Sequence, residues 1–319
     1  MAMFGRQRTR TERRGRAPRG FHAGRLIGGV LALALLAGCG GGDSSDDETS
    51  ADNSLFDVAF ATGQFVAVGT DGRILTSIDG RDFKETTSGV EATLNGATSG
   101  GGLLVVVGDS GTILTSPDAA TWTQEASPTS VSLQAVAHGN ARFVAVGYLG
   151  VIATSDDGRT WSMRDAGTNA TLLGVVFGET LFVAVGERGT VLTSPDGVTW
   201  SAQDAGTTET LYDVTFGAGT YVAAGANGSL GYSTDTAAWT FHREQVLNFG
   251  GVTFAEGQFA AVGYEGGIYT SPDGTTFTPR DSGTSSYLQS VVFGNGTFVT
   301  VGLGGTIRIS PDAVEWSSS

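Results

Sequence analysis

Residues 165–200 read DAGTNATLLGVVFGETLFVAVGERGTVLTSPDGVTW, and this segment shows the alternation of short apolar runs and turns on which the fold prediction rests. Its apolar runs at 172–177, 181–185 and 190–193 are rich in β-branched residues and are separated by glycine-containing turns. A fourth run begins near Trp200. Short runs of this kind predict antiparallel strands rather than helices. Four short strands in about 40 residues are typical of one blade of a β-propeller.

The same pattern occurs seven times from residue 54 onward, and each copy carries four marker residues at fixed spacing. Successive serines are 39 residues apart, except for one step of 38, and they are Ser77, Ser116, Ser155, Ser194, Ser233, Ser271 and Ser310. Two residues later stand Asp79, Asp118, Asp157, Asp196, Asp235, Asp273 and Asp312. Six residues after the serine stand Phe83, Trp122, Trp161, Trp200, Trp239, Phe277 and Trp316. Eight residues before it stand Gly69, Gly108, Gly147, Gly186, Gly225, Gly263 and Gly302.

Seven copies of a four-stranded unit predict an all-β fold, a seven-bladed β-propeller of four-stranded antiparallel blades. Residues 54–319 would form one domain, because the repeats of a closed ring cannot be divided into independent cores. The outer strand of the last repeat, from Trp316 to Ser319, is short. We therefore expect residues near 50–54 to help close the ring.

The segment S-x-D-x-x-x-W/F resembles the Asp box, also called the BNR repeat, with one box in each blade. The best copies are SDDGRTW at 155–161 and SPDGVTW at 194–200. An aspartate at a hairpin accepts backbone N–H groups that the turn leaves unpaired, and a glycine supplies the open backbone angle. The seven Asp-box aspartates are therefore expected to be structural rather than catalytic.

The first 53 residues differ in composition from the repeats. Residues 1–25 are rich in arginine, and residues 26–37 form an apolar run of 12. A membrane-spanning helix needs about 20 residues, so the run fits the apolar region of a signal peptide. Residues 36–39, Leu-Ala-Gly-Cys, resemble the bacterial lipobox. The resemblance implies cleavage before Cys39 and acylation of that cysteine; the alternative is an ordinary signal peptide with a chance cysteine.

These features divide the chain into a lipoprotein signal peptide (1–38), an acidic Gly/Ser tether (39–53) and the propeller (54–319). Gly40 follows the cysteine where an aspartate would suggest retention in the inner membrane. The predicted location is therefore the bacterial outer membrane, with the side of that membrane left open. Translation could start at Met1 or Met3.

Charge separates the two ends of the chain. Eight of the 18 basic residues and one of the 32 acidic residues precede Cys39, so the remainder carries 10 basic and 31 acidic residues and a net charge of −21. Such a surface repels nucleic acid and anionic lipid headgroups. Because Cys39 is the only cysteine, an internal disulfide is excluded.

Candidate functional positions are those where the seven copies disagree. In a propeller, the connections from the second to the third strand and from each fourth strand to the next blade share one face. On this face we select Tyr148, Glu187, Arg188, Tyr212, Tyr264 and Glu265. Asp57 and Asp213 stand on the strands expected to line the channel, where they could act as an acid/base pair, hold an ion, or simply be hydrated. His138 and His242 are 104 residues apart and give no metal-ligand spacing, so neither a metal nor a cofactor is predicted.

Asp-box propellers include sialidases, and that resemblance would imply three converging arginines, a tyrosine nucleophile with a supporting glutamate, and an acid. The nine arginines after Cys39 fall at scattered positions of the repeat, and Arg73-Ile74 and Arg308-Ile309 lack the proline of the sialidase Arg-Ile-Pro segment. Tyr264 and Glu265 combine the right residue types, but adjacent strand residues point apart. We therefore predict a protein without enzymatic activity; a sialidase-like glycoside hydrolase or a glycan-binding propeller is the alternative.

Over residues 54–316 the repeat is similar to the photosystem II stability/assembly factor-like propellers. That resemblance implies a noncatalytic scaffold that binds another protein during assembly of a membrane complex, through an arginine-rich patch. The matching arginines would be Arg164, Arg188, Arg243 and Arg280, each beside an acidic residue. We expect a monomeric lipoprotein, anchored in a membrane by its lipid, that binds a protein or a glycan and no nucleic acid.

Overall fold

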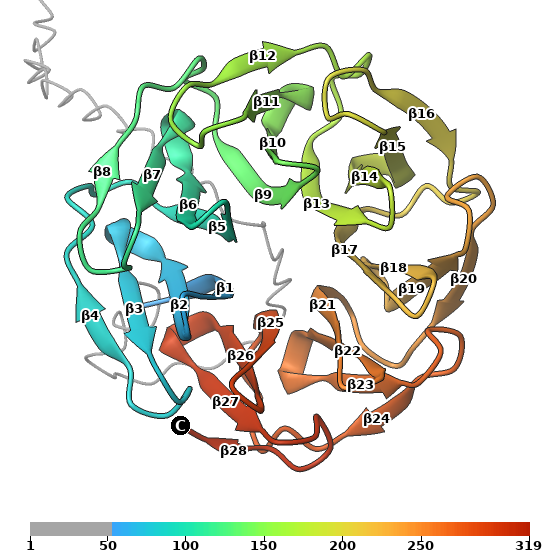
Figure 1. The fold of residues 1–319 in the computed structure, drawn as a ribbon. Coiled ribbons are helices and arrows are strands. Elements are labelled where there is room, and N and C mark those ends of the chain that lie inside the picture. The colour runs from blue at the N-terminus through green and yellow to red at the C-terminus, as the bar shows by residue number, and fades with distance from the viewer. Residues whose placement is uncertain (1–52) are drawn as a thin grey trace, which may run out of the picture. The chain divides into compact units, whose positions relative to one another are not determined.

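Each of the seven repeats folds into one sheet of four antiparallel strands, and the sheets stand side by side in a ring (Figure 1). The computed structural model describes residues 53–319. We number the blades 1 to 7 in chain order. This arrangement confirms the predicted all-β seven-bladed propeller.

The strands follow one another from the centre of the ring to its rim. The innermost strands are β1 (Leu55–Ala61), β5 (Leu94–Gly100), β9 (Leu133–Gly139), β13 (Leu172–Gly178), β17 (Leu211–Gly217), β21 (Phe249–Ala255) and β25 (Leu288–Gly294). The second strands are β2 (Gln64–Gly69), β6 (Leu103–Gly108), β10 (Arg142–Gly147), β14 (Leu181–Gly186), β18 (Thr220–Gly225), β22 (Gln258–Gly263) and β26 (Thr297–Gly302).

The third strands are β3 (Ile74–Ser77), β7 (Ile113–Ser116), β11 (Ile152–Ser155), β15 (Thr190–Ser194), β19 (Ser229–Ser233), β23 (Ile268–Ser271) and β27 (Ile307–Ser310). The outermost strands are β4 (Lys84–Thr86), β8 (Thr123–Gln124), β12 (Ser162–Arg164), β16 (Ser201–Asp204), β20 (Thr240–Arg243), β24 (Thr278–Arg280) and β28 (Ser317–Ser318). In blade 4 the three strands predicted by residue range agree with the observed ones to within one residue at each end.

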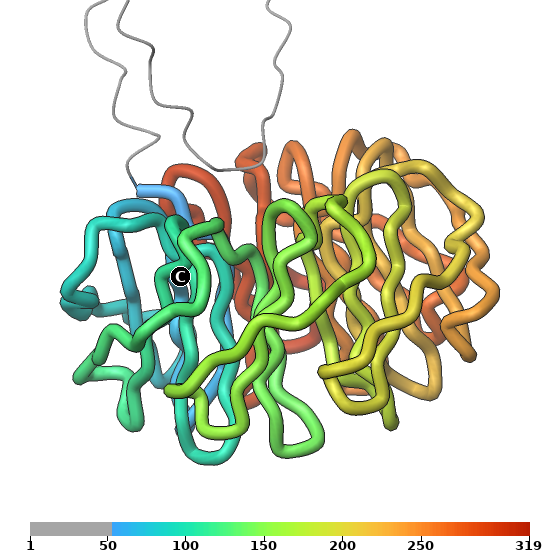
Figure 2. The backbone as a smooth tube through the Cα atoms, turned by 90° about the horizontal axis from the view of Figure 1, so that it is seen from above, coloured from blue at the N-terminus to red at the C-terminus, as the bar shows by residue number. Residues whose placement is uncertain are grey.

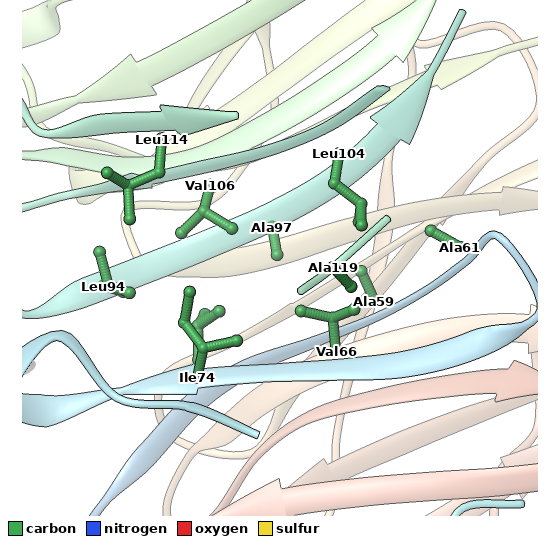
Figure 3. Packing of buried hydrophobic residues seen from close by; sticks show 11 residues of the cluster. Ala59, Ala61, Val66, Ile74, Leu94, Ala97, Leu104, Val106, Leu114 and Ala119 are labelled. Carbon is green, nitrogen blue, oxygen red and sulfur yellow. The ribbon is translucent and has the colours of Figure 1, made fainter. Parts of the chain in front are cut away.

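The hydrophobic core is divided into seven clusters, one between each pair of neighbouring blades. Strand β14 shows why its run is apolar throughout: Phe182 and Ala184 pack toward blade 3, whereas Val183 and Val185 pack toward blade 5. A strand that is buried on both faces reads as a continuous hydrophobic run. Figure 3 shows the cluster between blades 1 and 2, where Val66 lies among the side chains that fill the interface.

The repeated aromatic residue belongs to these clusters. Trp161 is buried between blades 2 and 3, and its indole Nε1–H donates to the carbonyl oxygen of Gly158 at 2.9 Å. The indoles of Trp200, Trp239 and Trp316 make the same bond to the residue three positions earlier, at 2.9–3.1 Å. The aromatic side chain thus joins the turn that precedes it to the interface between two blades.

The glycine at the end of each second strand allows two backbone segments to approach closely. A Cβ atom at Gly186 would lie 2.0 Å from the carbonyl oxygen of Thr171, just before β13. Gly186 has an extended φ of −173°, so the requirement is for space rather than for an unusual backbone angle. The contact brings the connection beyond β14 against the start of the innermost strand.

Ser54 contacts the last blade, as expected for residues near 50–54, but it adds no strand to that sheet. Blade 7 takes its outer strand β28 from its own repeat, and within the described residues no N-terminal strand joins that sheet. Residues 50–52 lie outside the described residues. Ser54 contributes a loop contact instead, because its Oγ accepts the N–H of Gly304 at 3.3 Å. Blades 1 and 7 are held by side-chain packing around Phe65 and Val299, as at the other six interfaces.

Candidate functional site

The connections between strands gather at two opposite faces of the ring (Figure 2). One, the turn face, carries the first-to-second-strand turns and the Ser-x-Asp turns between third and fourth strands. The other, the loop-rich face, carries the second-to-third-strand turns and the loops that enter the next blade. All six side chains that we selected as binding candidates stand on or next to the loop-rich face.

The second-to-third-strand turns share one backbone conformation. Six of them are short 3-10 turns: η1 (Thr70–Gly72), η2 (Asp109–Gly111), η3 (Tyr148–Gly150), η4 (Glu187–Gly189), η5 (Tyr264–Gly266) and η6 (Leu303–Gly305). The middle residue is left-handed, with φ of 56° at Leu149 and 52° at Glu265. In η3, η4 and η5 the first residue is half-buried and the middle one is exposed.

Three of the candidate residues on this face interact electrostatically. Burial raises the pKa of the Tyr148 phenol, and the negative charges of Asp109 and Glu187 raise it further. Burial also raises the pKa of Tyr212, again with a contribution from Glu187. The charge of Glu187 therefore acts on two phenols that come from different blades. Its Oε2 also accepts the backbone N–H of Thr171 at 3.3 Å, which fixes the carboxylate against its own blade.

A fourth tyrosine, which sequence reasoning missed, extends this group. Tyr287 retains 6% of its surface, and its pKa is raised by burial and by the neighbouring Tyr212. Its ring lies 6.0 Å from that of Tyr264, edge to face at 64°. The preceding repeats carry a small polar residue at this position: Ser54, Thr93, Ser132, Thr171, Thr210 and Asn248. The substitution of tyrosine for a serine, threonine or asparagine was the signal that could have found it.

We name this group the tyrosine rim. Its members are Tyr148, Glu187, Tyr212, Tyr264 and Tyr287. Electrostatic interactions connect Tyr148 to Glu187, Glu187 to Tyr212 and Tyr212 to Tyr287, and a ring contact connects Tyr287 to Tyr264. Together the five residues span blades 3 to 7. Tyr212 occupies the bulge of strand β17, between the paired residues Leu211 and Asp213. A bulge redirects a side chain, and the same position is variable in all seven blades.

The two predicted channel acids lie on innermost strands and accept backbone N–H groups of the next blade. Asp57 Oδ2 accepts the N–H of Ala97 at 2.8 Å, and its Oδ1 accepts the Ser290 hydroxyl at 2.6 Å. Asp213 Oδ2 accepts the N–H of Val252 at 2.9 Å. Both carboxyls thus connect blades, a contact that follows from the fold and needs no ligand.

The surroundings of these acids favour their neutral forms. Desolvation raises the pKa of Asp213 to about 7, with a smaller contribution from the charge of Asp57, whereas its backbone hydrogen bonds act in the opposite direction. Desolvation raises the pKa of Asp57 as well. The equivalent positions in the other five blades carry small residues, because successive innermost strands approach closely. A Cβ atom at Gly174, for example, would lie 2.8 Å from Cα of Asp213.

A pocket of about 430 Å³ opens on the loop-rich face between blades 5 and 6. Its walls combine carboxylates, phenols and aliphatic side chains: Glu244, Val246, Leu247, Tyr264, Glu265 and Tyr269. The predicted pair Tyr264 and Glu265 therefore lines this pocket, and Tyr264 also belongs to the tyrosine rim. The remaining four residues were not predicted. Glu244, Val246 and Leu247 lie in the loop between the fifth and sixth repeats, where the marker serines are 38 instead of 39 residues apart. This shorter spacing is the sequence signal for the pocket.

The predicted arginines do not gather around the tyrosine rim. Arg164 and Arg280 end outermost strands, where each Nε donates to a threonine of its own blade at 2.9 Å. Arg243 forms an ion pair with Glu209. Arg188 is exposed at the tip of η4, and Leu149 is exposed at the tip of η3.

The aspartates of the Ser-x-Asp turns lie on the turn face and hold the turn backbone. Asp196 Oδ1 accepts the N–H groups of Val198 and Thr199 at 2.8 and 2.9 Å and the Ser194 hydroxyl at 3.0 Å. These bonds lower the pKa of Asp196 below its ordinary value. The residue that follows each aspartate has a positive φ, 72° at Gly197 and 65° at Thr236. The same bonding by Oδ1 recurs at Asp79, Asp118, Asp157, Asp235, Asp273 and Asp312.

The other chemical groups of the site are isolated. His138 packs against Phe143 in blade 3, and His242 stacks on Tyr232 in blade 5, so the two histidines are far apart in the fold. Between residues 53 and 319, no group of three or more histidine, cysteine, aspartate or glutamate side chains is arranged to hold a metal ion. The part of the chain described here also contains no helix of the length and hydropathy that a membrane span requires.

Comparison with known proteins gives solved structures of the same fold. No protein-family model and no curated protein matches the chain. The structure of YCF48 bound to D1 peptide is 19% identical, with a TM-score of 0.65 over 81% of this chain and 91% of that one. YCF48 from Cyanidioschyzon merolae is 20% identical, with a TM-score of 0.63 over 81% and 95% of the two chains. The WD40 propeller domain of Doa1 is 12% identical, with a TM-score of 0.67 over 84% and 94%. At these identities the similarity shows the propeller fold.

Proposed function

We propose that this chain is an exported, noncatalytic module that binds a partner protein on its loop-rich face. The observation that carries the proposal is the tyrosine rim. Seven repeats with a common backbone bring four phenols and one carboxylate together on the face where the copies differ most. Tyrosine offers a large contact area with few rotatable bonds and a polar end, and it is enriched in protein interfaces.

Rigid support favours binding at this surface. The rim residues start or flank strands whose apolar side chains are fully buried between blades, such as Leu211 and Leu288. Side chains that are held in place before binding lose less conformational entropy when a partner arrives. YCF48, which shares the fold, has been solved with a D1 peptide, and this supports a protein partner for the present chain as well.

The geometry of the acidic groups favours binding over hydrolysis. Tyr264 is half-buried against Tyr287, whereas Glu265 is exposed at the tip of η5, so the pair does not form a nucleophile with a supporting base. Asp57 and Asp213 are both engaged by backbone N–H groups. Hydrolysis of a fluorogenic sialoside by the purified chain would contradict the noncatalytic part of the proposal.

The binding proposal is tested by affinity capture from envelope extracts with the full chain as bait. The test variant combines Tyr148→Ala, Arg188→Ala and Tyr264→Ala, and the matched variant changes Ile78→Ala and Arg81→Ala on the turn face. We expect the first variant to lose partners that the wild type and the second variant retain. Equal recovery by all three proteins, with unchanged thermal unfolding, would contradict the proposed face.

We also propose that Cys39 carries the lipid that anchors the protein at the bacterial outer membrane. The support is the Leu-Ala-Gly-Cys segment at 36–39 and the glycine-rich acidic tether that follows it. Acyl chains stabilise membrane attachment by about 0.8 kcal/mol per buried methylene. Metabolic labelling with a palmitate analogue should mark the wild type and not Cys39→Ala, and membrane fractionation should release the variant. Labelling of both proteins would contradict this assignment.

A further inference from the structure

The pocket between blades 5 and 6 owes its existence to one altered loop. The loops after blades 3, 4 and 6 carry Asp-x-Gly-Thr, in which the aspartate accepts the glycine N–H at 2.8–2.9 Å. Their glycines have φ of 66–67°. After β20 the chain reads Glu244-Gln245-Val246-Leu247, one residue shorter and without the glycine. The compact turn is therefore replaced by an open loop.

The altered loop is nevertheless anchored at both ends. The N–H of Glu244 donates to the carbonyl oxygen of Gly228 at 2.8 Å, and the N–H of Gly228 donates to that of Leu247 at 3.0 Å. Between these anchors Leu247 presents its side chain outward and remains 60% exposed. The loop thus lines the pocket together with η5 and β23 of blade 6.

The chemistry of the pocket matches a cation with an apolar stem. Glu244 from the altered loop and Glu265 from η5 both line the pocket, and so do the phenols Tyr264 and Tyr269. Burial raises the pKa of Tyr269, and the charge of Glu244 raises it further, so the carboxylate acts on this phenol electrostatically. Aromatic faces and carboxylates attract ammonium and guanidinium groups, and aliphatic carbons such as those of Val246 pack against the stem of the same side chain.

No basic side chain lines the pocket. Arg243, which precedes the loop, is held by Glu209, and Glu209 is itself bonded by the side chain of Asn227 at 2.6 Å. The two pocket carboxylates therefore have no cationic partner among the residues of their own lining. The volume of about 430 Å³ falls within the range of small-ligand sites.

We propose that this pocket binds an arginine or lysine side chain carried by an extended segment of a partner protein. The inference rests on the proposed binding role and adds the chemical class of the segment that is recognised. The apolar stem packs on Val246 and Leu247, and the charged end reaches Glu244 and Glu265. The tyrosine rim, which shares Tyr264 with the pocket, contacts the neighbouring part of the same partner.

The test uses fluorescence anisotropy with the full chain and two short labelled peptides. In the first peptide arginines alternate with alanines, and in the second each arginine is replaced by glutamine. The pocket variants are Glu244→Gln and Glu265→Gln. The matched control is Glu256→Gln, which removes the same charge from the same blade on the turn face. Each binding curve is repeated at high salt.

We expect the wild type and Glu256→Gln to bind the arginine peptide equally and the glutamine peptide far more weakly. The variant that combines Glu244→Gln and Glu265→Gln should bind the arginine peptide about tenfold more weakly than the wild type, which corresponds to about 1.4 kcal/mol. Equal affinity for both peptides, or equal losses in Glu256→Gln and the pocket variants, would overturn the inference. Affinity capture distinguishes the two proposals: if partners are lost with the tyrosine-rim variant but the arginine peptide is not bound, only the pocket inference fails.

Discussion

The turn face and the loop-rich face are built from the same seven repeats. The marker side chains of the turn face are the same in every repeat, whereas those of the loop-rich face differ from repeat to repeat. On the turn face, every copy keeps the serine and aspartate that hold the turn. Blades are also tied together there in register: side chains of Gln64, Arg142 and Gln258 donate to the carbonyl oxygens of Asp118, Asp196 and Asp312 at 2.6–3.0 Å. On the loop-rich face the first two residues of each turn vary freely.

Backbone hydrogen bonds explain this difference. The loop-rich turns are held by main-chain contacts: in η1 the N–H of Arg73 donates to the carbonyl oxygen of Thr70 at 2.9 Å, and the N–H of Thr70 donates to that of Ser54 at 3.0 Å. Since these bonds require no particular side chain, the side chains can differ from copy to copy. A turn that is stabilised by its side chains, such as the one at Asp196, does not have that freedom.

The largest expected effect comes from the glycine that ends strand β14. Gly186→Ala places a Cβ atom 2.0 Å from a backbone carbonyl oxygen and should lower the free energy of unfolding by about 3 kcal/mol. The matched variant Gly167→Ala meets no atom within 4 Å and has only the backbone strain of a φ of 66°, so we expect a loss of about 1 kcal/mol. Urea unfolding of both variants measures the difference. A smaller loss for Gly186→Ala than for Gly167→Ala would contradict the close-approach explanation.

The next effect contrasts an acid at the ring centre with one on the turn face. Asp213, with its pKa raised to about 7, keeps a proton in the folded state that the unfolded chain releases near its ordinary value of 3.8. The free energy of unfolding should therefore fall as pH rises between about 4 and 7. We expect a decline on the order of 2 kcal/mol, which is less than the full pKa shift would give, because part of the side chain stays exposed. The free energy of unfolding of Asp213→Asn should lack this decline.

Asp157 is the matched acid, because hydrogen bonds lower its pKa. Its contribution is fully present above the ordinary pKa and is lost only as the pH falls below it. Asp157→Asn should therefore leave the pH dependence between 4 and 7 unchanged. The prediction fails if the decline in the free energy of unfolding between pH 4 and 7 disappears in Asp157→Asn or persists in Asp213→Asn. Either result would mean that burial of Asp213 is not the cause of the decline.

A smaller effect is expected from truncation of one turn-face acid. Asp196→Ala removes the acceptor of two backbone N–H groups and should cost about 1 kcal/mol, as does loss of a helix N-cap of similar geometry. Asp82→Ala removes an exposed aspartate of another turn on the same face and should change the free energy of unfolding by less than about 0.5 kcal/mol. Equal effects in chemical unfolding would mean that the turn does not depend on its aspartate.

The smallest effect on stability belongs to the loop-rich face. Leu149→Ala and Arg188→Ala alter exposed turn tips that retain their left-handed backbone, so each should shift the free energy of unfolding by less than about 0.5 kcal/mol. Arg188→Ala should nevertheless reduce partner capture. A large loss of stability in either variant would show that these side chains hold the turn, as the aspartates do on the opposite face.

The repeat made the fold predictable, because a marker set spaced by 39 residues leaves few architectures that fit. It could not predict which side chains from distant repeats meet. Tyr212 and Tyr287 lie 75 positions apart and come together only when blades 5 to 7 complete the curve. The pocket beside Leu247 depends on one missing residue, whose effect is visible only once the loop is built. Ring closure was predicted only in outline: Ser54 contacts blade 7, and the short strand β28 completes the sheet from its own repeat.

Site-specific cross-linking in cells shows which face of the ring meets a partner protein. Leu247 and Ile78 are both exposed apolar side chains, 60% and 72% accessible, on opposite faces of the ring. A photo-reactive amino acid is placed at each position in turn in the full chain, and cells are irradiated. We predict adducts with a partner protein from position 247 and none from position 78. Adducts from position 78 alone, or equally from both, would contradict the account.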